Sequence, residues 1–383
     1  MKYWLDRKIA PDAAATHALI VGVSTYSDLD KLPEKLKGKL RQLNSAATAA
    51  WKVACWLRDR YNSNSPLGTI QLLASPSSAE KAATPELGAL PPARREDVRK
   101  ALFEWKRLCQ LNTNGVGILY VAGHGIACSD EQSYVLLEDF GSDPVLLEHA
   151  VDVSIVRSGM LEEDIAQNQL YFVDACRIPM AAFKEFRNLG QGILLPGSTT
   201  TEDRRCSPVY FSAAPGTESY GEAKVGTVFS QALIQCLDQC AAREPQAEGE
   251  PWHVTTSSLE EALESRVQAL AKERRIKQTV VAGGQRRTET IHTYKTPPEV
   301  PVSIRLRPDE AQEFALADLS DSNGVYLEKK RSFDPNPLPW SAPAGIYQVE
   351  VSISPEGARV YGKFKKKLFA AKPPASETEV SVG

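Results

Sequence analysis

The sequence predicts an α/β fold: a mostly parallel sheet with helices on both faces, followed by a small C-terminal all-β domain of the sandwich type. Up to about residue 290, apolar runs that fit buried strands alternate with segments of helical periodicity, which is the order typical of parallel sheets. Beyond Glu299 the segments are short and alternate polar with apolar residues. The length of 383 residues suits two domains. We therefore expect an N-terminal extension, a main domain and a β domain over residues 1–15, 16–293 and 299–383.

Strands of the main domain are expected where apolar residues run continuously, because strands of a parallel sheet are buried on both faces. They cover residues 17–26, 69–75, 116–125, 169–176, 208–216 and 277–284. Helices are expected where apolar residues recur at helical spacing, over residues 44–61, 94–111, 226–240 and 257–270. Asn44 or Ser45 is expected to cap the first helix, and the Ser-, Ala- and Pro-rich residues 75–92 are expected to form an exposed loop.

The β domain is expected to follow a Pro-rich hinge, YKTPPEVPVS, and to fold separately. Its tail from Lys372 is expected to be frayed. The stretch KFKKKLF (363–369) predicts an edge strand whose solvated lysines guard against aggregation, and contact with an acidic partner is the alternative.

Composition excludes several classes of protein. A net charge of −3 predicts neither nucleic acid nor an anionic membrane as a partner. No apolar run approaches the ~18 residues that span a bilayer, and the charged first residues do not fit a signal peptide. Seven irregularly spaced cysteines fit reduced thiols and a cytoplasmic location.

A histidine stands between two glycines at the end of a predicted buried strand, in GILYVAGHGIA (117–127), and a cysteine ends another predicted strand, in QLYFVDAC (169–176). Because ligands of open parallel sheets bind beyond the carboxyl ends of the strands, His124 and Cys176 are expected to share one crevice. An imidazole that takes the thiol proton creates a nucleophile, so the pair predicts a Cys–His catalytic site. The competing interpretation is a buried apolar cysteine and a structural turn histidine.

Gly125 has no side chain to hinder the approach of a substrate to the backbone. Its N–H and that of Cys176 are expected to face the carbonyl oxygen under attack and to form an oxyanion hole. No cofactor and no metal site are expected. Zinc binding by Cys236, Cys240 and His253, and calcium binding by the acidic stretch SDEQSYVLLEDFGSD (129–143), are both less favoured than solvated or structural roles.

The motifs LYVAGHG and YFVDAC resemble the His and Cys motifs of the caspase/metacaspase group of cysteine proteases, including bacterial caspase-like proteins. In the caspase signature Q-A-C-[RQG]-G, a His lies about 50 residues upstream. The stretch DACRI matches it at Arg177 and departs from it at Asp174 and Ile178. Four further segments resemble the group in chain order, and the likeness covers about residues 16 to 290: ALIVGVSTYSDLDKLP, VYFSAAPGTESY, GTVFSQAL and KQTVVAGG.

The resemblance implies a cysteine endopeptidase with His124 as general base, Cys176 as nucleophile and Gly125 in the oxyanion hole, acting on a protein substrate. No third, orienting residue is required in the group, and the sequence identifies none. The resemblance also implies that VYFSAAPG contains the substrate-binding strand, with the substrate-contacting residues Ser212, Ala213 and Ala214.

The residue two positions before the cysteine helps to shape the pocket for the side chain that precedes the scissile bond. Metacaspases have Asp there and cut after Arg or Lys, so Asp174 implies the same preference. A structural carboxylate held by hydrogen bonds is the alternative. Metacaspases also carry Asn-Asp at the start of the first helix. This chain has Asn44-Ser45, and Asp28 or Asp30 is expected to supply the missing charge.

The segment between Cys176 and the next strand corresponds to the activation loop of the group. Its second half, Pro196 to Pro208, is expected to be exposed, with Arg204 and Arg205 as sites of self-cleavage. The alternative is a loop that stays whole and is reordered by an activating protein, bound through the β domain. The resemblance implies a bacterial defence or cell-death pathway. Two other functions remain open: a caspase-like scaffold without activity, and another Cys-dependent hydrolase.

Overall fold

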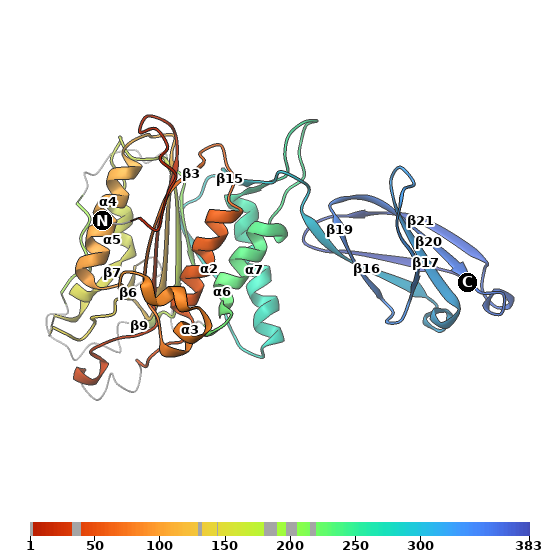
Figure 1. Ribbon diagram of the computed structural model, residues 1–383, viewed down its shortest axis with the longest axis horizontal. Helices are drawn as coiled ribbons and strands as arrows, with labels where there is room; N and C mark the ends of the chain where they lie inside the picture. The colour runs from red at the N-terminus through yellow and green to blue at the C-terminus, as the bar shows by residue number, and fades with distance from the viewer. Residues whose placement is uncertain are drawn as a thin grey trace. The chain divides into compact units, whose positions relative to one another are not determined.

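The computed structural model describes residues 3–32, 40–128, 132–143, 145–179, 190–196, 205–214 and 220–383. The chain forms two compact units (Figure 1). Unit 1 joins Met1–Gln235 and Thr255–His292, and unit 2 joins Cys236–Val254 and Thr293–Gly383. The predicted main domain, residues 16–293, therefore includes a segment that belongs with the C-terminal strands. Trp252 in this segment packs against their apolar core.

Unit 1 is built on a seven-stranded sheet in the order β1-β3-β2-β4-β8-β10-β14. The five inner strands are parallel, and the two edge strands run antiparallel to their neighbours. Continuous apolar sequence gives inner strands that are buried along nearly all of their length. The predicted mostly parallel sheet is confirmed. Its strands are β1 (Leu5–Asp6), β2 (Thr16–Val23), β3 (Leu67–Ser75), β4 (Val116–Gly123), β8 (Asn168–Ala175), β10 (Ser207–Phe211) and β14 (Val281–Gln285).

Helices cover both faces of this sheet, as predicted. Figure 1 shows α4 (Arg95–Cys109) and α5 (Val153–Ser158) on one side, and α2 (Ala46–Asp59), α6 (Val228–Gln235) and α7 (Thr256–Glu273) on the other. Helix α4 buries Val98, Leu102 and Trp105 along one stripe at helical spacing. In the part of the chain that the structure describes, no helix combines the length and the apolar composition needed to cross a bilayer.

The N-terminus of α2 is capped from other parts of the chain. Ser45 occupies the cap position, but its side chain makes no capping hydrogen bond. Instead, the hydroxyl oxygen of Ser24 accepts hydrogen bonds from the N–H groups of Ala46 and Ala47, at 3.0 and 3.1 Å. The prediction of a local cap is wrong at Ser45, because Ser24 at the exit of β2 already satisfies these donors.

The prediction that residues 75–92 form a loop is also wrong, although most of these residues are exposed as expected. This segment contains α3 (Ser78–Ala83) and the 3₁₀-helix η2 (Pro85–Ala89), and Glu80 within it is completely buried. Glu80 forms a capping box with Ser77, and its carboxylate accepts a hydrogen bond from Thr48 N–H in the first turn of α2 (2.9 Å). A negative charge is favourable at a helix N-terminus, which accounts for the buried acid.

A second, four-stranded sheet with the order β7-β6-β5-β9 lies beyond the carboxyl ends of β4 and β8. It consists of β5 (Gly125–Ala127), β6 (Ser133–Leu136), β7 (Ala150–Asp152) and β9 (Ile178–Pro179). The remaining short elements of the described residues before Glu299 are β11 (Gly221–Glu222), β12 (Gly226–Thr227), β13 (His253–Thr255), β15 (Thr290–Thr293), the 3₁₀-helices η1 (Leu29–Lys31) and η3 (Leu146–His149), and the π-helix η5 (Cys236–Cys240).

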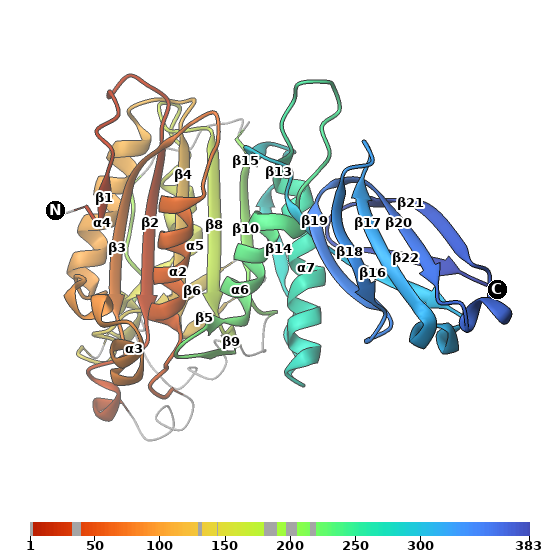
Figure 2. The same ribbon diagram turned by 45° about the vertical axis from the view of Figure 1, so that its right-hand side comes forward.

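The C-terminal strands of unit 2 form two sheets, β19-β16-β22 and β18-β17-β20-β21 (Figure 2). The buried residues of the two sheets form one core. The predicted all-β character of this part is confirmed. The predicted frayed tail is wrong, since β22 pairs in parallel with β16. The elements are β16 (Glu299–Arg307), η6 (Asp309–Phe314), β17 (Ala315–Asp321), β18 (Tyr326–Ser332), β19 (Leu338–Pro343), β20 (Gly345–Ile353), η7 (Gly357–Arg359), β21 (Phe364–Ala371) and β22 (Ser376–Ser381).

Candidate active site

His124 and Cys176 lie side by side where the chain passes from the main sheet to the four-stranded sheet. The parallel pairing of β4 with β8 ends with Gly123 opposite Ala175, and β5 then pairs with β9 at the same offset of 52 positions. His124 and Cys176 are also 52 positions apart, and the strand pairings before and after them in the chain fix their positions. The Sγ atom of Cys176 lies 3.8 Å from Nδ1 of His124, which is within reach of a hydrogen bond to sulfur. The expected shared crevice therefore has its two principal groups in contact.

The other ring nitrogen of His124 defines the tautomer. Nε2 lies 2.6 Å from the backbone carbonyl oxygen of Arg41. A carbonyl oxygen only accepts hydrogen bonds, so Nε2 carries the hydrogen and Nδ1 presents its lone pair to the thiol of Cys176. Burial lowers the pKa of His124, although the bond to Arg41 opposes that shift. The imidazole is thus neutral near pH 7 and able to accept a proton.

Tyr26 and Gln42 hold this arrangement in place. The hydroxyl oxygen of Tyr26 accepts a hydrogen bond from the N–H of His124 (2.7 Å), and the two rings are 5.1 Å apart. The side-chain amide of Gln42 bonds both backbone groups of Tyr26, accepting from its N–H and donating to its carbonyl, each at 2.8 Å. Gln42 therefore fixes the neighbouring carbonyl of Arg41 relative to His124.

The sequence did not reveal this third group. Arg41 acts through a backbone carbonyl, which every residue has, so its side chain leaves no signature. Of the groups that position His124, the one with a recognisable side chain in the sequence is Tyr26, an aromatic residue close after the first buried strand.

Gly125 is required by the close approach of the two strands. A β-carbon at this position would lie 2.2 Å from the carbonyl oxygen of Cys176. The N–H of Leu136 donates to the carbonyl of His124 (2.8 Å), so Gly125 and Val135 face each other as a non-hydrogen-bonded pair. The N–H of Gly125 consequently points away from β6, to the side of β5 on which β9 lies.

Asp174 is buried beneath the site and accepts hydrogen bonds at Oδ2 from two hydroxyls. Tyr120 donates at 2.6 Å and Thr227 donates through Oγ1. Burial, and then the neighbouring charge of Asp174, raise the pKa of the Tyr120 hydroxyl, which keeps it a donor. The sequence left two interpretations of Asp174 open, a carboxylate that binds a cationic substrate side chain and a structural carboxylate held by hydrogen bonds. The two hydroxyls are the donors that the structural interpretation required.

The other expected substrate-binding residues differ in exposure. Asp28 forms an ion pair with Lys31 at 2.5 Å, so its charge already has a cationic partner. Ser212 is buried, and its hydroxyl donates to the carbonyl of Ala175 at 3.2 Å. Ala213 is buried as well, and Ala214 is half-buried. These three residues follow β10 directly, beside the strand end that leads to Cys176.

Of the two expected cleavage sites, Arg204 lies outside the described residues. Arg205 is buried, and its guanidinium donates to the backbone carbonyls of Glu162 (2.6 Å) and Met160 (3.4 Å). The expectation that Arg205 is exposed is therefore wrong. The carbonyls that follow α5 need donors, and the arginine provides them.

The acidic stretch has structural partners where it is described. Glu138 accepts hydrogen bonds from Ser75 (2.6 Å) and Ser27 (3.0 Å) and pairs with Arg94. Asp139 accepts from the N–H of Arg95 at the start of α4. Among the described residues, which exclude Asp130 and Glu131, no three His, Cys, Asp or Glu side chains are placed to hold a metal ion.

Comparison with known proteins places this geometry in a family. The family model of the caspase domain matches residues 15–281. An uncharacterized protein of Sinorhizobium fredii, y4kE, is 26% identical over 275 residues, which are 68% of this chain and 76% of that protein. The crystal structure of protein GSU0716 from Geobacter sulfurreducens has 14% identity and a TM-score of 0.42, and covers 72% of this chain and 95% of its own.

Caspase-1 from Spodoptera frugiperda has 13% identity and a TM-score of 0.44, and the match covers 76% of this chain and 96% of that one. The caspase-domain match takes in five strands of the parallel sheet and both residues of the candidate dyad. The protein belongs to the caspase domain family of cysteine peptidases.

Proposed function

We propose that the protein is a cysteine endopeptidase in which His124 is the general base and Cys176 the nucleophile. The observation that carries the proposal is the contact of Cys176 Sγ with His124 Nδ1 at 3.8 Å, while Nε2 is occupied by the Arg41 carbonyl. A scaffold would have no use for this tautomer, because a structural histidine needs no lone pair directed at a thiol. The arrangement matches the requirement for an activated nucleophile with an oriented base.

The reaction then follows from the geometry. Nδ1 of His124 takes the thiol proton as Sγ bonds to the scissile carbonyl carbon, and the N–H groups of Gly125 and Cys176 stabilise the oxyanion. The imidazolium gives its proton to the departing amine as the C–N bond breaks, leaving an acyl-enzyme. Water, deprotonated by His124, hydrolyses the thioester and regenerates the thiol. Because burial lowers the pKa of His124, the resting imidazole is neutral and can accept the thiol proton.

A preference for Arg or Lys before the scissile bond is part of the proposal. It is supported by a buried carboxylate, Asp174, two positions before the nucleophile. Hydrogen bonds from Tyr120 and Thr227 favour its ionised form. Where water is excluded, a negative charge attracts a cationic side chain more strongly than it does in water. Asp28 contributes less to this preference in the proposal, since Lys31 already neutralises it.

Activity is proposed to be controlled by cleavage after Arg204 or by a protein partner. Cleavage between Arg204 and Arg205 requires Arg205 to leave its contacts with Met160 and Glu162. Intact-mass analysis of the wild type and Cys176→Ala, with and without an activating lysate, tests this. We expect a cut after Arg204 in the wild type alone. A chain that stays whole while it cleaves other proteins would contradict self-processing. A role in bacterial defence or cell death is proposed from the family relationship.

Labelling with an activity-based probe for cysteine peptidases tests the main proposal. We expect the wild type to be labelled and Cys176→Ala to be silent, with Cys128→Ala, which changes an exposed thiol, labelled like the wild type. Equal labelling of the wild type and Cys176→Ala would contradict the assignment. A peptide library then separates an endopeptidase from another Cys-dependent hydrolase, since only an endopeptidase cleaves internal peptide bonds.

A further inference from the structure

The two edges of the four-stranded sheet in unit 2 differ. At one edge, β18 pairs irregularly with β17, with register shifts between Ala317 and Ser320, and Lys330 has a positive φ of 55°. Such bulges protect an edge strand from further pairing. At the other edge, β21 pairs with β20 without a shift over its full length, from Phe364 to Ala371. Within the described chain β21 has no second partner strand, so this edge is long, regular and open.

The side chains of β21 lie alternately on the two faces of the sheet, and both faces carry lysine. Lys365 and Lys367 lie on the face of the sheet that carries the core residues of β20 opposite them. Phe364 and Leu368 lie on the other face and are 54% and 63% exposed; Lys366 lies between them and pairs with Glu350 at 3.1 Å. A strand protected by charge alone needs lysines but no exposed apolar residues. The apolar pair therefore calls for an explanation beyond protection.

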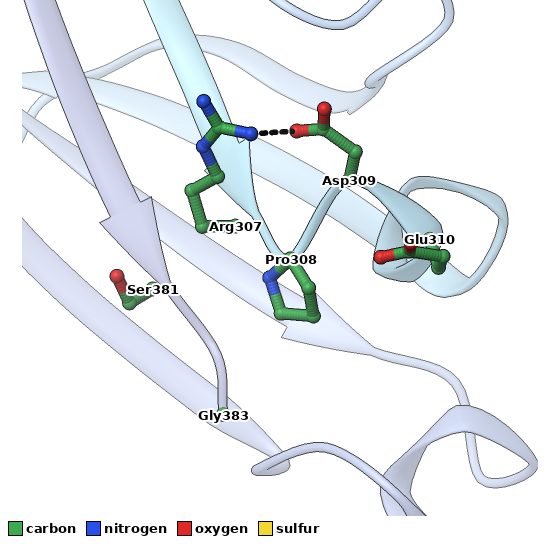
Figure 3. A pocket seen from close by; sticks show the side chains of 6 residues that line it. All are labelled: Arg307, Pro308, Asp309, Glu310, Ser381 and Gly383. Atoms are coloured by element: carbon green, nitrogen blue, oxygen red, sulfur yellow. Dashed lines mark hydrogen bonds and ion pairs between the residues drawn. The ribbon is translucent and has the colours of Figure 1, made fainter.

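The charges of Lys365 and Lys367 are less well balanced than that of Arg307, which has two carboxylate partners. Arg307 pairs with Asp309 at 3.0 Å and with Glu379 at 3.4 Å, beside a shallow hollow at the chain's C-terminus (Figure 3). Within the part of the chain that the structure describes, Lys367 donates only to a backbone carbonyl, that of Glu379. Among the described residues, no carboxylate lies within ion-pair distance of Lys365. The open edge thus presents two cations, two positions apart, that have no carboxylate partner in the described chain.

We propose that β21 binds an extended acidic segment of a protein partner as an additional strand. The backbone of the partner would pair with the open edge, and its side chains would lie alternately on the two faces of the sheet. Neighbouring side chains on one face of a sheet lie about 5 Å apart, so carboxylates two positions apart would meet Lys365 and Lys367. Apolar side chains between them would cover Phe364 and Leu368.

A second copy of this chain does not fit the same edge. Two β21 strands placed edge to edge would bring rows of lysine together, and like charges directly opposite are unfavourable. The lysines thus select against self-association and for an acidic segment. The proposal does not rest on peptidase activity.

Binding of synthetic peptides to the full-length chain carrying Cys176→Ala tests the proposal, measured by fluorescence anisotropy at two salt concentrations. The probe is a fluorescein-labelled ten-residue peptide of alternating Glu and Val. One control has Lys for Glu, and the other has Pro at alternate Val positions, which keeps the charge but cannot form a strand. We expect the Glu–Val peptide to bind at least tenfold more tightly than either control. We also expect added protection of β21 amides in hydrogen exchange.

The variant Lys365→Glu/Lys367→Glu should bind the Glu–Val peptide at least tenfold more weakly, and should bind the Lys–Val peptide in its place. Lys329→Glu on the bulged edge strand β18 is the matched control and should change neither affinity. Equal binding of the Pro-containing peptide, or of a single-stranded oligonucleotide, would show simple charge attraction and overturn strand addition. Absence of Glu–Val binding by the parent chain, or binding without protection of β21 amides, would overturn it as well.

Discussion

Two buried histidines lie at opposite ends of the main sheet. His17 stands at the start of β2, and its Nδ1 meets the hydroxyl of Thr69 at 2.9 Å. Burial lowers its pKa to about 4. His124 follows the end of β4, and burial lowers its pKa too, but its Nδ1 faces a thiol and its Nε2 a fixed carbonyl. Burial and a perturbed pKa are therefore shared by a structural histidine and a candidate base. The partners of the ring nitrogens distinguish the two.

The largest expected difference between the two ends of the sheet is in catalysis. His124→Ala and Cys176→Ala should each lower kcat/KM for a peptide substrate by about 10³-fold or more, since groups that act as a unit fail together. His17→Ala should keep kcat/KM within about threefold and lower only the melting temperature. The measurement is a steady-state assay beside a thermal melt. Activity near that of the wild type in either dyad variant would contradict the assignment.

Gln42 tests whether the position of the Arg41 carbonyl matters. Gln42→Ala removes both hydrogen bonds to the Tyr26 backbone, and a shift of about 1 Å at His124 would cost up to about 100-fold in kcat. KM should change little, because Gln42 acts through another residue and does not touch the substrate. Gln71→Ala, at a buried glutamine in β3, is a control for general destabilisation. An unchanged kcat with a lowered melting temperature would reduce Gln42 to a structural residue.

Substitution of Asp174 tests whether its charge determines substrate specificity or whether its carboxylate only stabilises the structure. Asp174→Asn keeps an acceptor for the hydroxyls of Tyr120 and Thr227 but removes the charge. If Asp174 attracts a cation, kcat/KM should fall about tenfold more on Arg than on uncharged substrates, a factor worth about 1.4 kcal/mol. The measurement compares fluorogenic peptides with Arg, Lys, Ala and Asp before the scissile bond. Equal losses on all of them, or cleavage after Asp by the wild type, would indicate a structural carboxylate.

The pH dependence should differ between activity and stability. Activity needs neutral His124, whose pKa lies below 6.5, so the acid limb of kcat/KM should have its midpoint below pH 6.5. His17 and His292 have folded pKa values of about 4 against 6.5 for the unfolded group. Between these values the unfolded chain binds more protons, so the free energy of unfolding should fall as the pH drops from 6.5 to 4. Urea titrations across this window measure it. A constant free energy would contradict the burial of these rings.

The smallest effect is expected from removing the C-terminal strands. A chain truncated at Thr296 should keep peptide cleavage within about threefold, because both dyad residues belong to unit 1. Trp252 would lose the apolar core against which it packs, so Trp252→Ser should be added to keep the truncated chain soluble. An inactive but folded truncation would show that the C-terminal strands complete the peptidase.

The main sheet could be predicted from the sequence, because its inner strands are continuous apolar runs. His124 and Cys176 could be predicted as site residues, because they end two of those runs. Features that depend on groups distant in the sequence could not be predicted. Ser24 caps α2 across 22 positions, and Arg41 orients His124 across 83. Glu80 in a predicted exposed loop is buried because Thr48 supplies a donor. Local pattern cannot show such contacts, since each one exists only after the chain has folded.

The most direct test of the dyad is the alkylation rate of Cys176 by iodoacetamide at pH 7, followed by peptide mapping, since it needs no knowledge of the substrate. If Nδ1 of His124 takes the thiol proton, the wild type should react at least about tenfold faster than His124→Ala. His17→Ala should react like the wild type, because its imidazole has a different partner. Equal rates in the wild type and His124→Ala would contradict the central claim that His124 activates Cys176.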